Sequence, residues 1–288
     1  MKYIITFILF LQLVLGFPFK NNNTVNFYTV TDDDNRANFS FVNYNSFNFK
    51  TNELKILSNF SVLPNQLSCL RLLHHKNKFY SVDDTTGFLY EINPKNKNIK
   101  KYDQYNNFHK GEGMTKVDND FYIFNYTKFS KKINESEFRY NLVKYNFKNK
   151  KVDKVYNLTD WINLYLDKLN YKFVDINAID INQDKLYLVP RYYHNFKNKI
   201  KYNNNHFYVI SYDGIQKIKL SEKMPKKYGI VDMDIYDDKI YFIATLETKD
   251  HKFNTMFFIT DLQGNLLTKY IEYDKYNKYE GISVVPSK

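Results

Sequence analysis

Short apolar segments alternate with polar turns along most of the chain, and helical periodicity is scarce. Within these segments one unit recurs: a polar residue, an apolar residue, a tyrosine, and then a run that favours strands. Its five copies are 26–28, 78–80, 120–122, 185–187 and 239–241. Their tyrosines are 52, 42, 65 and 54 residues apart, which is the size of a four-stranded propeller blade with variable loops.

The two ends of the chain complement each other. Four of the five units follow an apolar strand, at 70–73, 114–117, 179–181 and 233–236. The first unit has no such strand before it, while the chain ends in an apolar strand, 282–285, that has no unit of its own. Pairing of that strand beside Phe27 hides both open sheet edges. The sequence therefore predicts an all-β fold, a five-bladed β-propeller closed by its C-terminal strand, with an irregular β-sandwich as the alternative.

The N-terminus has the pattern of a signal peptide. A basic start precedes an almost unbroken apolar run at 4–15, and Gly16 offers a small residue for cleavage. The run is shorter than the roughly 20 apolar residues that span a bilayer, and an uncleaved anchor is the alternative. We therefore expect a secreted protein with a signal peptide at 1–16, a short spacer at 17–24 and one propeller domain at 25–288.

Two residue types bear on this secretory route. The chain has one cysteine, Cys69, so it forms no internal disulfide framework and must be stable through burial. Six Asn-x-Ser/Thr sites predict a glycoprotein. They are Asn22, Asn38, Asn59, Asn125, Asn134 and Asn157.

One helix is predicted, at 160–169 after Thr159, as an insertion in a loop.

The net charge of +11 comes from 38 lysines and 4 arginines set against 31 acidic residues. Together with the many Asn, Tyr, Ile and Phe residues, this reflects a bias in the coding DNA, so we read the charge as a solvated surface and expect no nucleic-acid partner. Such a field still attracts small polyanions such as nucleotides. Since arginine is rare, Arg36, Arg71, Arg139 and Arg191 deserve separate examination.

Oxygen-bearing residues stand where the innermost strand of each predicted blade begins. They are Ser68, Glu112, Asn177, either Val231 or Asp232, and Glu280. In a propeller these positions converge on the central channel, and Ca²⁺ takes six to eight such oxygen ligands. The set is a poor site for Zn²⁺ or Cu²⁺ because no His or Cys belongs to it. The alternative is that these residues cap strand ends beside a water-filled channel.

Several short motifs occur in the order found in one enzyme family. The stretch 78–92 contains Val-Asp-Asp-Thr-Thr-Gly, 32–36 reads Asp-Asp-Asp-Asn-Arg, and 160–163 reads Asp-Trp-Ile-Asn. Val-Pro-Arg at 189–191 and Tyr-Glu-Gly-Ile at 279–282 complete the series. Taken together, these motifs resemble the calcium-activated nucleotidases, or salivary-type apyrases, over nearly the whole chain.

The resemblance implies a Ca²⁺-dependent enzyme that hydrolyses nucleoside di- and triphosphates to monophosphate and phosphate. It places Ser68, Glu112 and Glu280 on the family's calcium ligands, with Asn177 and Asp232 as the corresponding oxygen donors here. It places Asp32, Asp34 and Arg191 on catalytic positions, with Arg191 on the phosphate side. It assigns substrate binding to Arg36, Asp83, Asp84 and Lys128. Tyr90, Trp161 or Tyr192 could stack on a base.

The chain also departs from the family pattern. Asn177 stands where the family has glutamate, Val231 or Asp232 where it has serine, and Thr85 where it has the arginine after the paired aspartates. These changes favour a second hypothesis, a catalytically impaired propeller that binds nucleotides or other small ligands. A third is a secreted structural or host-interacting protein without a central ligand.

Overall fold

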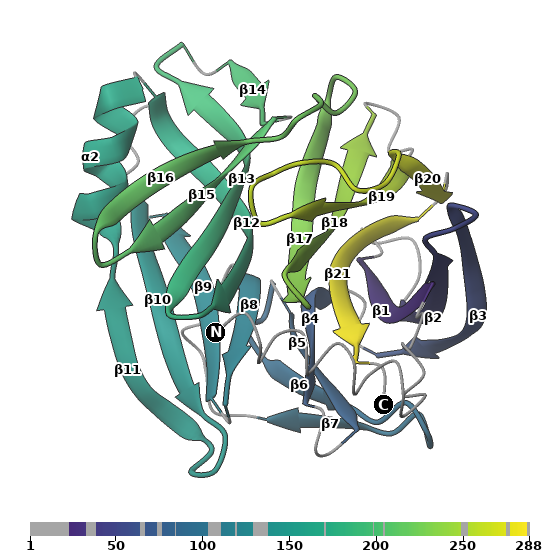
Figure 1. The fold of residues 1–288 in the computed structure, drawn as a ribbon. Coiled ribbons are helices and arrows are strands. Elements are labelled where there is room, and N and C mark those ends of the chain that lie inside the picture. The colour runs from purple at the N-terminus through teal and green to yellow at the C-terminus, as the bar shows by residue number, and fades with distance from the viewer. Residues whose placement is uncertain are drawn as a thin grey trace, which may run out of the picture.

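The computed structural model describes residues 23–32, 39–63, 67–73, 77–83, 85–102, 111–118, 120–128, 138–169, 171–197, 199–203, 205–248, 253–274 and 277–286. Its strands form five antiparallel sheets, which Figure 1 shows arranged in a ring. The expected signal peptide at 1–16 lies outside the described residues, and the first strand begins at Thr24 within the expected spacer. In the described part of the chain, no helix has the length and apolar character needed to cross a membrane.

Each sheet is one blade, and we number the blades along the chain. Blade 1 contains β21 (Lys278–Val285), β1 (Thr24–Asp32), β2 (Ser40–Asn48) and β3 (Glu53–Val62). Blade 2 contains β4 (Leu67–Leu73), β5 (Lys78–Asp83), β6 (Leu89–Ile92) and β7 (Ile99–Tyr102). Blade 3 contains β8 (Gly111–Val117), β9 (Asp120–Lys128), β10 (Phe138–Asn146) and β11 (Lys151–Asn157).

The last two blades follow the same plan. Blade 4 contains β12 (Tyr171–Asn182), β13 (Lys185–Asn195), β15 (His206–Ser211) and β16 (Gly214–Lys219), with β14 (Ile200–Tyr202) added beside β13. Blade 5 contains β17 (Tyr228–Tyr236), β18 (Lys239–Glu247), β19 (Phe253–Asp261) and β20 (Ile271–Asp274). The predicted five-bladed propeller is confirmed.

The C-terminal strand closes the ring as predicted. β21 pairs antiparallel with β1, with Val284 opposite Phe27 and Ser283 opposite Tyr28. Each innermost strand contacts the innermost strand of the next blade, from β21 through β4, β8, β12 and β17 back to β21. The first and last strands of the chain therefore share one sheet, and neither is left as an open edge.

The core consists of five apolar layers, one between each pair of adjacent blades. Because side chains alternate across a strand, every sheet presents apolar residues to both of its neighbours. Aromatic rings fill much of this space: Phe27 of blade 1 stacks on Phe257 of blade 5 with ring centroids 4.7 Å apart. Burial of Phe and Tyr thus replaces the disulfides that the single cysteine, Cys69, excludes.

One helix, α2 (Thr159–Leu169), interrupts the pattern between blades 3 and 4, as predicted. The side chain of Asn157 accepts a hydrogen bond from the Thr159 backbone N–H at 2.9 Å at the start of this helix. Its inner face packs on the layer between blades 3 and 4 through Ile162. Figure 1 shows α2 on the outside of the ring, so it supports the blades without lining the channel.

Candidate functional site at the propeller axis

The innermost strand of every blade contains a β-bulge near its beginning. In four strands one residue of the bulge has no partner in the neighbouring strand, and in β4 two residues, Cys69 and Leu70, lie opposite Ser81. The unpartnered residues are Glu112, Asn177, Val231 and Glu280. Bulges redirect side chains out of the regular ladder, so the same irregularity brings Glu112, Asn177 and Glu280 to equivalent positions. The predicted Ser68 precedes the bulge in β4 and is paired with Val82.

The bulges distinguish the two alternatives in blade 5. Val231 occupies the position of Glu112 and Glu280, whereas Asp232 follows the bulge, paired with Ile243. The residues that follow the other bulges are small: Gly113, Ala178 and Gly281. The carboxylate of Asp232 is fully buried and binds both terminal nitrogens of Arg71, at 3.0 and 3.1 Å. Asp232 therefore belongs to an ion pair below the ring of predicted ligands. Val231 takes the ring position of blade 5, and its apolar side chain offers no ligand atom.

Three ring side chains carry the polar chemistry at this level. Asn177 donates its side-chain N–H to Glu112 Oε2 at 3.0 Å, and both residues are buried. This leaves Asn177 Oδ1 buried without a hydrogen-bond partner among the described residues. Glu280 is buried as well, and its Oε1 lies 2.9 Å from Nζ of Lys278. An amide oxygen that lacks a donor beside carboxylates is the environment that a hard cation satisfies.

The ring offers the oxygen atoms that Ca²⁺ prefers, but its side chains supply fewer than the six to eight ligands that the ion takes. No group of three or more His, Cys, Asp or Glu side chains suited to a metal occurs in the described part of the chain. A Ca²⁺ ion here would use Glu112 and Glu280 together with the Asn177 amide oxygen, the hydroxyl of the buried Ser68, and water. Such a set has too few nitrogen and sulfur donors for Zn²⁺.

Arg191 brings a buried cation to the same ring. Its Nη1 lies 3.7 Å from Glu280 Oε1. The centre of the aromatic ring of the adjacent Tyr192 lies 5.9 Å from Arg191 Cζ. Burial by itself would lower the pKa of Arg191, but the charges of Glu280 and Asp175 raise it, so the guanidinium stays charged. Gly229 gives it room, since a Cβ there would lie 2.6 Å from Arg191 Cγ. A phosphate at the ring would meet a fixed positive charge.

The remaining predicted residues divide into three groups. Asp83 is buried and accepts hydrogen bonds from the backbone N–H groups of Thr85 at 3.1 Å and Thr86 at 2.7 Å, so it forms the β5–β6 turn. Asp32 ends β1 opposite Lys278, next to the ring, and Lys128 ends β9; the structure describes the backbone of both and not their side chains. Asp34, Arg36 and Asp84 lie outside the described residues.

Arg71 is the axial residue whose role the sequence did not reveal. Its guanidinium lies among backbone carbonyls from four of the five innermost strands, all at the position one residue before Arg71 or its equivalents. These carbonyls are Leu70 O at 2.6 Å, Ile179 O at 2.9 Å, Met233 O at 2.5 Å and Ile282 O at 2.9 Å. The rarity of arginine was the signal available; the carbonyl cage exists only once the ring has closed. Arg71 therefore occupies the axis as a built-in cation.

A belt of hydrogen bonds joins the blades at the level of Arg71. In four of the five junctions a side-chain oxygen of one innermost strand accepts a hydrogen bond from a backbone N–H of the next. The bonds are Leu72 N to Ser283 Oγ (2.9 Å), Ile181 N to Thr115 Oγ1 (3.1 Å), Ile235 N to Asp180 Oδ2 (2.6 Å) and Val284 N to Asp234 Oδ2 (2.6 Å). The fifth junction begins at Arg71, which has no acceptor and reaches the axis instead.

The belt predicts an unusual dependence of stability on pH. Burial and the charge of Asp180 raise the pKa of Asp234 to about 7, against about 4 in an unfolded chain. The folded state therefore binds the Asp234 proton more tightly than the unfolded chain does. The free energy of unfolding that this protonation contributes declines as pH rises from about 4 through 7. We expect Asp234→Asn to gain about 1–2 kcal/mol relative to the wild type between pH 5 and pH 7.

Urea unfolding of both proteins at several pH values measures this difference. Asp238→Asn, on the exposed turn between β17 and β18, is the matched control and should change the free energy of unfolding by less than about 0.5 kcal/mol. A constant difference between the wild type and Asp234→Asn over this range would contradict the assignment.

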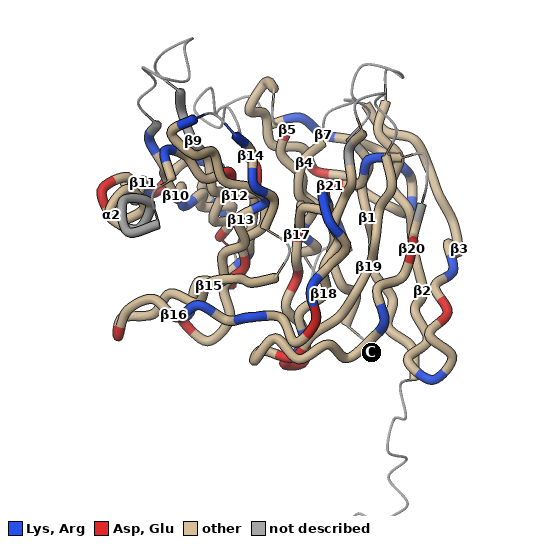
Figure 2. The backbone as a smooth tube through the Cα atoms, turned by 90° about the horizontal axis from the view of Figure 1, so that it is seen from above, with Lys and Arg blue, Asp and Glu red and all other residues tan. Residues whose placement is uncertain are grey.

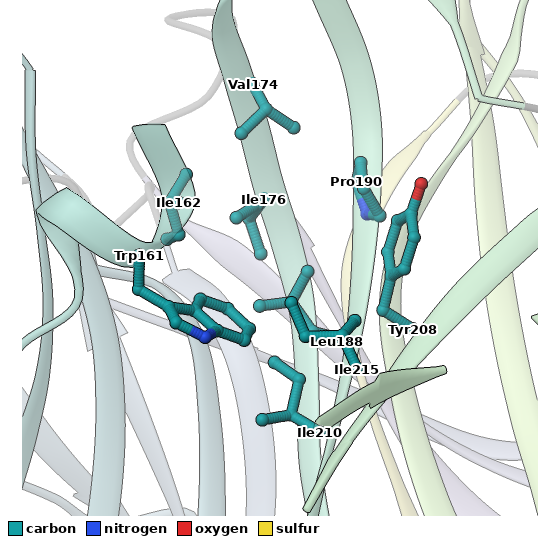
Figure 3. Close-up of a pocket in the computed structure, with 9 residues that line it drawn as sticks. All are labelled: Trp161, Ile162, Val174, Ile176, Leu188, Pro190, Tyr208, Ile210 and Ile215. Carbon is teal, nitrogen blue, oxygen red and sulfur yellow. The ribbon is translucent and has the colours of Figure 1, made fainter. Parts of the chain in front are cut away.

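Trp161 lies in a different environment from the axial residues. Figure 3 shows it on α2, beside Ile162 and facing residues of β12, β13 and β15, such as Ile176 and Leu188. The pocket that these side chains line is apolar and has a volume of about 20 Å³. This is far below the roughly 300–1,000 Å³ of small-molecule sites, so the pocket has no room for a nucleotide base. Trp161 thus supports the layer between blades 3 and 4, and of the expected stacking residues Tyr192 is the one beside Arg191.

Comparison with known proteins adds no family to this description. No protein-family model and no curated protein matches the chain in sequence. Among solved structures, a chain of a nidogen/laminin complex matches with a TM-score of 0.47 and 10% identity, over 92% of this chain and 99% of that one. A chain of hydrazine synthase from Kuenenia stuttgartiensis matches with a TM-score of 0.37 and 10% identity, over 72% of this chain and 49% of that one.

Proposed function

We propose that this protein is a secreted, Ca²⁺-dependent phosphohydrolase that converts nucleoside di- and triphosphates to monophosphate and phosphate. The observation that carries the proposal is Glu280, which belongs to the ring of oxygen donors and also lies 3.7 Å from the buried Arg191. A site for a hard cation and a site for phosphate are thereby adjacent. The motif resemblance supplies the substrate class, which the ring chemistry by itself leaves open.

The residues have separate roles in this mechanism. Glu112, Asn177, Ser68 and Glu280 would hold the ion, which supplies polarisation of phosphoryl oxygens and orientation of water when bound. Arg191 pairs with the phosphate as negative charge builds up on it during transfer. Because burial and neighbouring carboxylates fix the guanidinium, little reorganisation accompanies this contact.

In this mechanism a carboxylate of residues 32–34 acts on the attacking water. Asp32 ends β1 opposite Lys278, two residues from Glu280, and the motif resemblance supports Asp32 or Asp34 as the group that positions or deprotonates the nucleophile. Asp83 is not given a role in substrate binding, because its carboxylate is engaged in the β5–β6 turn. Arg36, Asp84 and Lys128 stay predictions for the substrate side.

One observation favours a second candidate function, a binding propeller without turnover. Lys278 Nζ lies 2.9 Å from Glu280, so the chain already places an ammonium group against one of the two ring carboxylates. With Val231 and Asn177 replacing acidic or hydroxyl ligands, the ring has little negative charge to spare for a metal. Such a protein would bind a nucleotide through Arg191 and Lys278 and release it unchanged.

Phosphate release separates the two functions. Purified protein is incubated with ADP, ATP, UDP or GDP in millimolar Ca²⁺ and again with a chelator, and phosphate is measured together with the melting temperature. We expect release that requires Ca²⁺ and a melting temperature that Ca²⁺ raises. Absence of release from all four nucleotides would overturn the enzyme, and a retained Ca²⁺ effect on melting would then identify the binding propeller.

A further inference from the structure

A second polar pocket lies in blade 4, on different residues from the axial ring. It is formed where β14, the start of β15 and the end of β16 meet the connection at 220–227, and its volume is about 690 Å³. This falls within the roughly 300–1,000 Å³ of small-molecule sites. Asn203 separates the two regions: it lines this pocket, and its backbone N–H donates to Arg191 O at 2.9 Å. The pocket is thus a neighbour of the axial site and not part of it.

The pocket is positively charged without compensation. Four lysines line it: Lys201 of β14, Lys217 of β16, and Lys223 and Lys226 of the following connection. No Asp or Glu lines it, and none of the four lysines forms an ion pair within the described residues. Figure 2 shows Lys or Arg positions in blue on β14 and β16. Desolvation, followed by the charges of Lys201 and Lys219, lowers the pKa of Lys217.

Aromatic rings supply the other half of the lining. Tyr171 and Tyr193 stack with ring centroids 4.7 Å apart, and Lys201 Nζ lies 5.7 Å from the centre of the Tyr171 ring. Tyr171 is half-buried, so part of its ring is accessible from the pocket. An aromatic surface flanked by ammonium groups is complementary to a ligand that is planar at one end and anionic at the other.

The buried residue beneath the pocket is uncharged and held in place. His206 Nε2 accepts from the hydroxyl of Tyr193 at 2.7 Å, while its Nδ1 lies 2.8 Å from Asn205 Oδ1. Burial, with Lys217, Lys201 and Lys219, lowers the pKa of His206 to about 3, so the imidazole stays neutral at physiological pH. Positive charge in the pocket therefore comes from the lysine side chains, and the imidazole beneath them adds none.

We propose that this pocket binds an organic polyphosphate without a metal ion, with the phosphates on Lys201, Lys217, Lys223 and Lys226 and a planar group against Tyr171. Phosphates attract several ammonium groups at once, and four lysines match the charge of a nucleoside triphosphate. Because none of the described residues that line the pocket carries a carboxylate, the interaction needs no bridging cation. The inference goes beyond the axial reaction and holds whether or not that reaction occurs.

Titration calorimetry with ATP tests the proposal on the whole secreted chain, in excess chelator and at low salt. The wild type is expected to bind, and the double variant Lys201→Gln/Lys217→Gln to bind at least 10-fold more weakly. The control double variant Lys148→Gln/Lys150→Gln changes the net charge equally, on the exposed turn before β11, and should bind like the wild type. If both double variants lost the same affinity for ATP, the net charge of the protein would explain the binding, and the proposed site would be overturned.

Two further arms identify what the pocket recognises. Tripolyphosphate should show the same dependence on Lys201 and Lys217, whereas Tyr171→Leu should weaken ATP and leave tripolyphosphate unchanged. An ATP affinity that Tyr171→Leu does not alter would overturn the aromatic contact. Arg191→Gln separates this inference from the axial function, because it should lower Ca²⁺-dependent phosphate release and leave binding in chelator intact. Loss of chelator-resistant binding in Arg191→Gln would move the ligand to the axis and overturn the second pocket.

Discussion

Replacing Arg71 with methionine is expected to lower the free energy of unfolding by about 3–5 kcal/mol, the cost of breaking a buried ion pair from one side. The change leaves the fully buried Asp232 carboxylate with the Ile282 N–H, at 2.8 Å, in place of a bidentate guanidinium. It also removes the donor from four backbone carbonyls, each of which is costly to leave unsatisfied in a buried place. Urea unfolding of the wild type and the variant measures the loss.

Two controls make this result specific to the axis. Lys148→Met removes an exposed cationic side chain and should change stability by less than about 0.5 kcal/mol. The double variant Arg71→Met/Asp232→Leu removes both charges, and it should recover part of the loss because no unpaired carboxylate is left. A loss below about 1 kcal/mol in Arg71→Met would show that water in the channel replaces the guanidinium, and would contradict its role as the axial cation.

The second large effect is expected from Glu280→Gln, and it depends on the proposed function. The substitution keeps the size of the side chain, removes one of the two ring carboxylates, and removes the negative charge that lies 3.7 Å from Arg191 and 2.9 Å from Lys278. We expect Ca²⁺-dependent phosphate release to fall by about 100-fold or more, the upper range for groups that hold or orient a metal. The rise in melting temperature with Ca²⁺ should disappear in the same variant.

The controls distinguish the ring from general loss of charge. Glu222→Gln removes an exposed glutamate after β16 and should leave both readouts unchanged. Lys278→Met removes the ammonium group that lies 2.9 Å from Glu280, so it should increase the response to Ca²⁺. An unaltered calcium response in Glu280→Gln would exclude this ring as the ion site.

The axial cation also has a bearing on how the two levels of the channel work together. Burial raises the pKa of Asp232 to about 6 against the opposing effect of Arg71, so this carboxylate is ionised at neutral pH and pairs with the guanidinium. Positive charge on the axis is thus neutralised below the ring. Under the proposed function it would not repel a Ca²⁺ ion held at Glu112 and Glu280, and the ion pair would serve closure of the propeller alone.

The sequence by itself determined the number of blades and the way in which the ring closes. The recurring tyrosine unit and the unpaired apolar strand at 282–285 can both be read from short stretches of sequence. This is because a strand buried on both faces needs apolar residues wherever it lies in the fold. The ring positions Glu112, Asn177 and Glu280 followed from the same recurrence, because equivalent places in each unit meet at the axis. The helix at 160–169 was predicted as a loop insertion after a Thr159 cap. In the structure Thr159 is its first residue, and Asn157 accepts the hydrogen bond from the Thr159 N–H.

Only the tertiary structure decided which side chains meet. The choice between Val231 and Asp232 depends on a one-residue bulge in β17, a backbone irregularity that residue types do not specify. Arg71 finds its partners more than 100 residues away, in carbonyls that converge after five blades have packed. Likewise Lys278 was one lysine among 38 until the fold placed it against Glu280. Contacts of this kind arise from ring closure, and no local pattern encodes them.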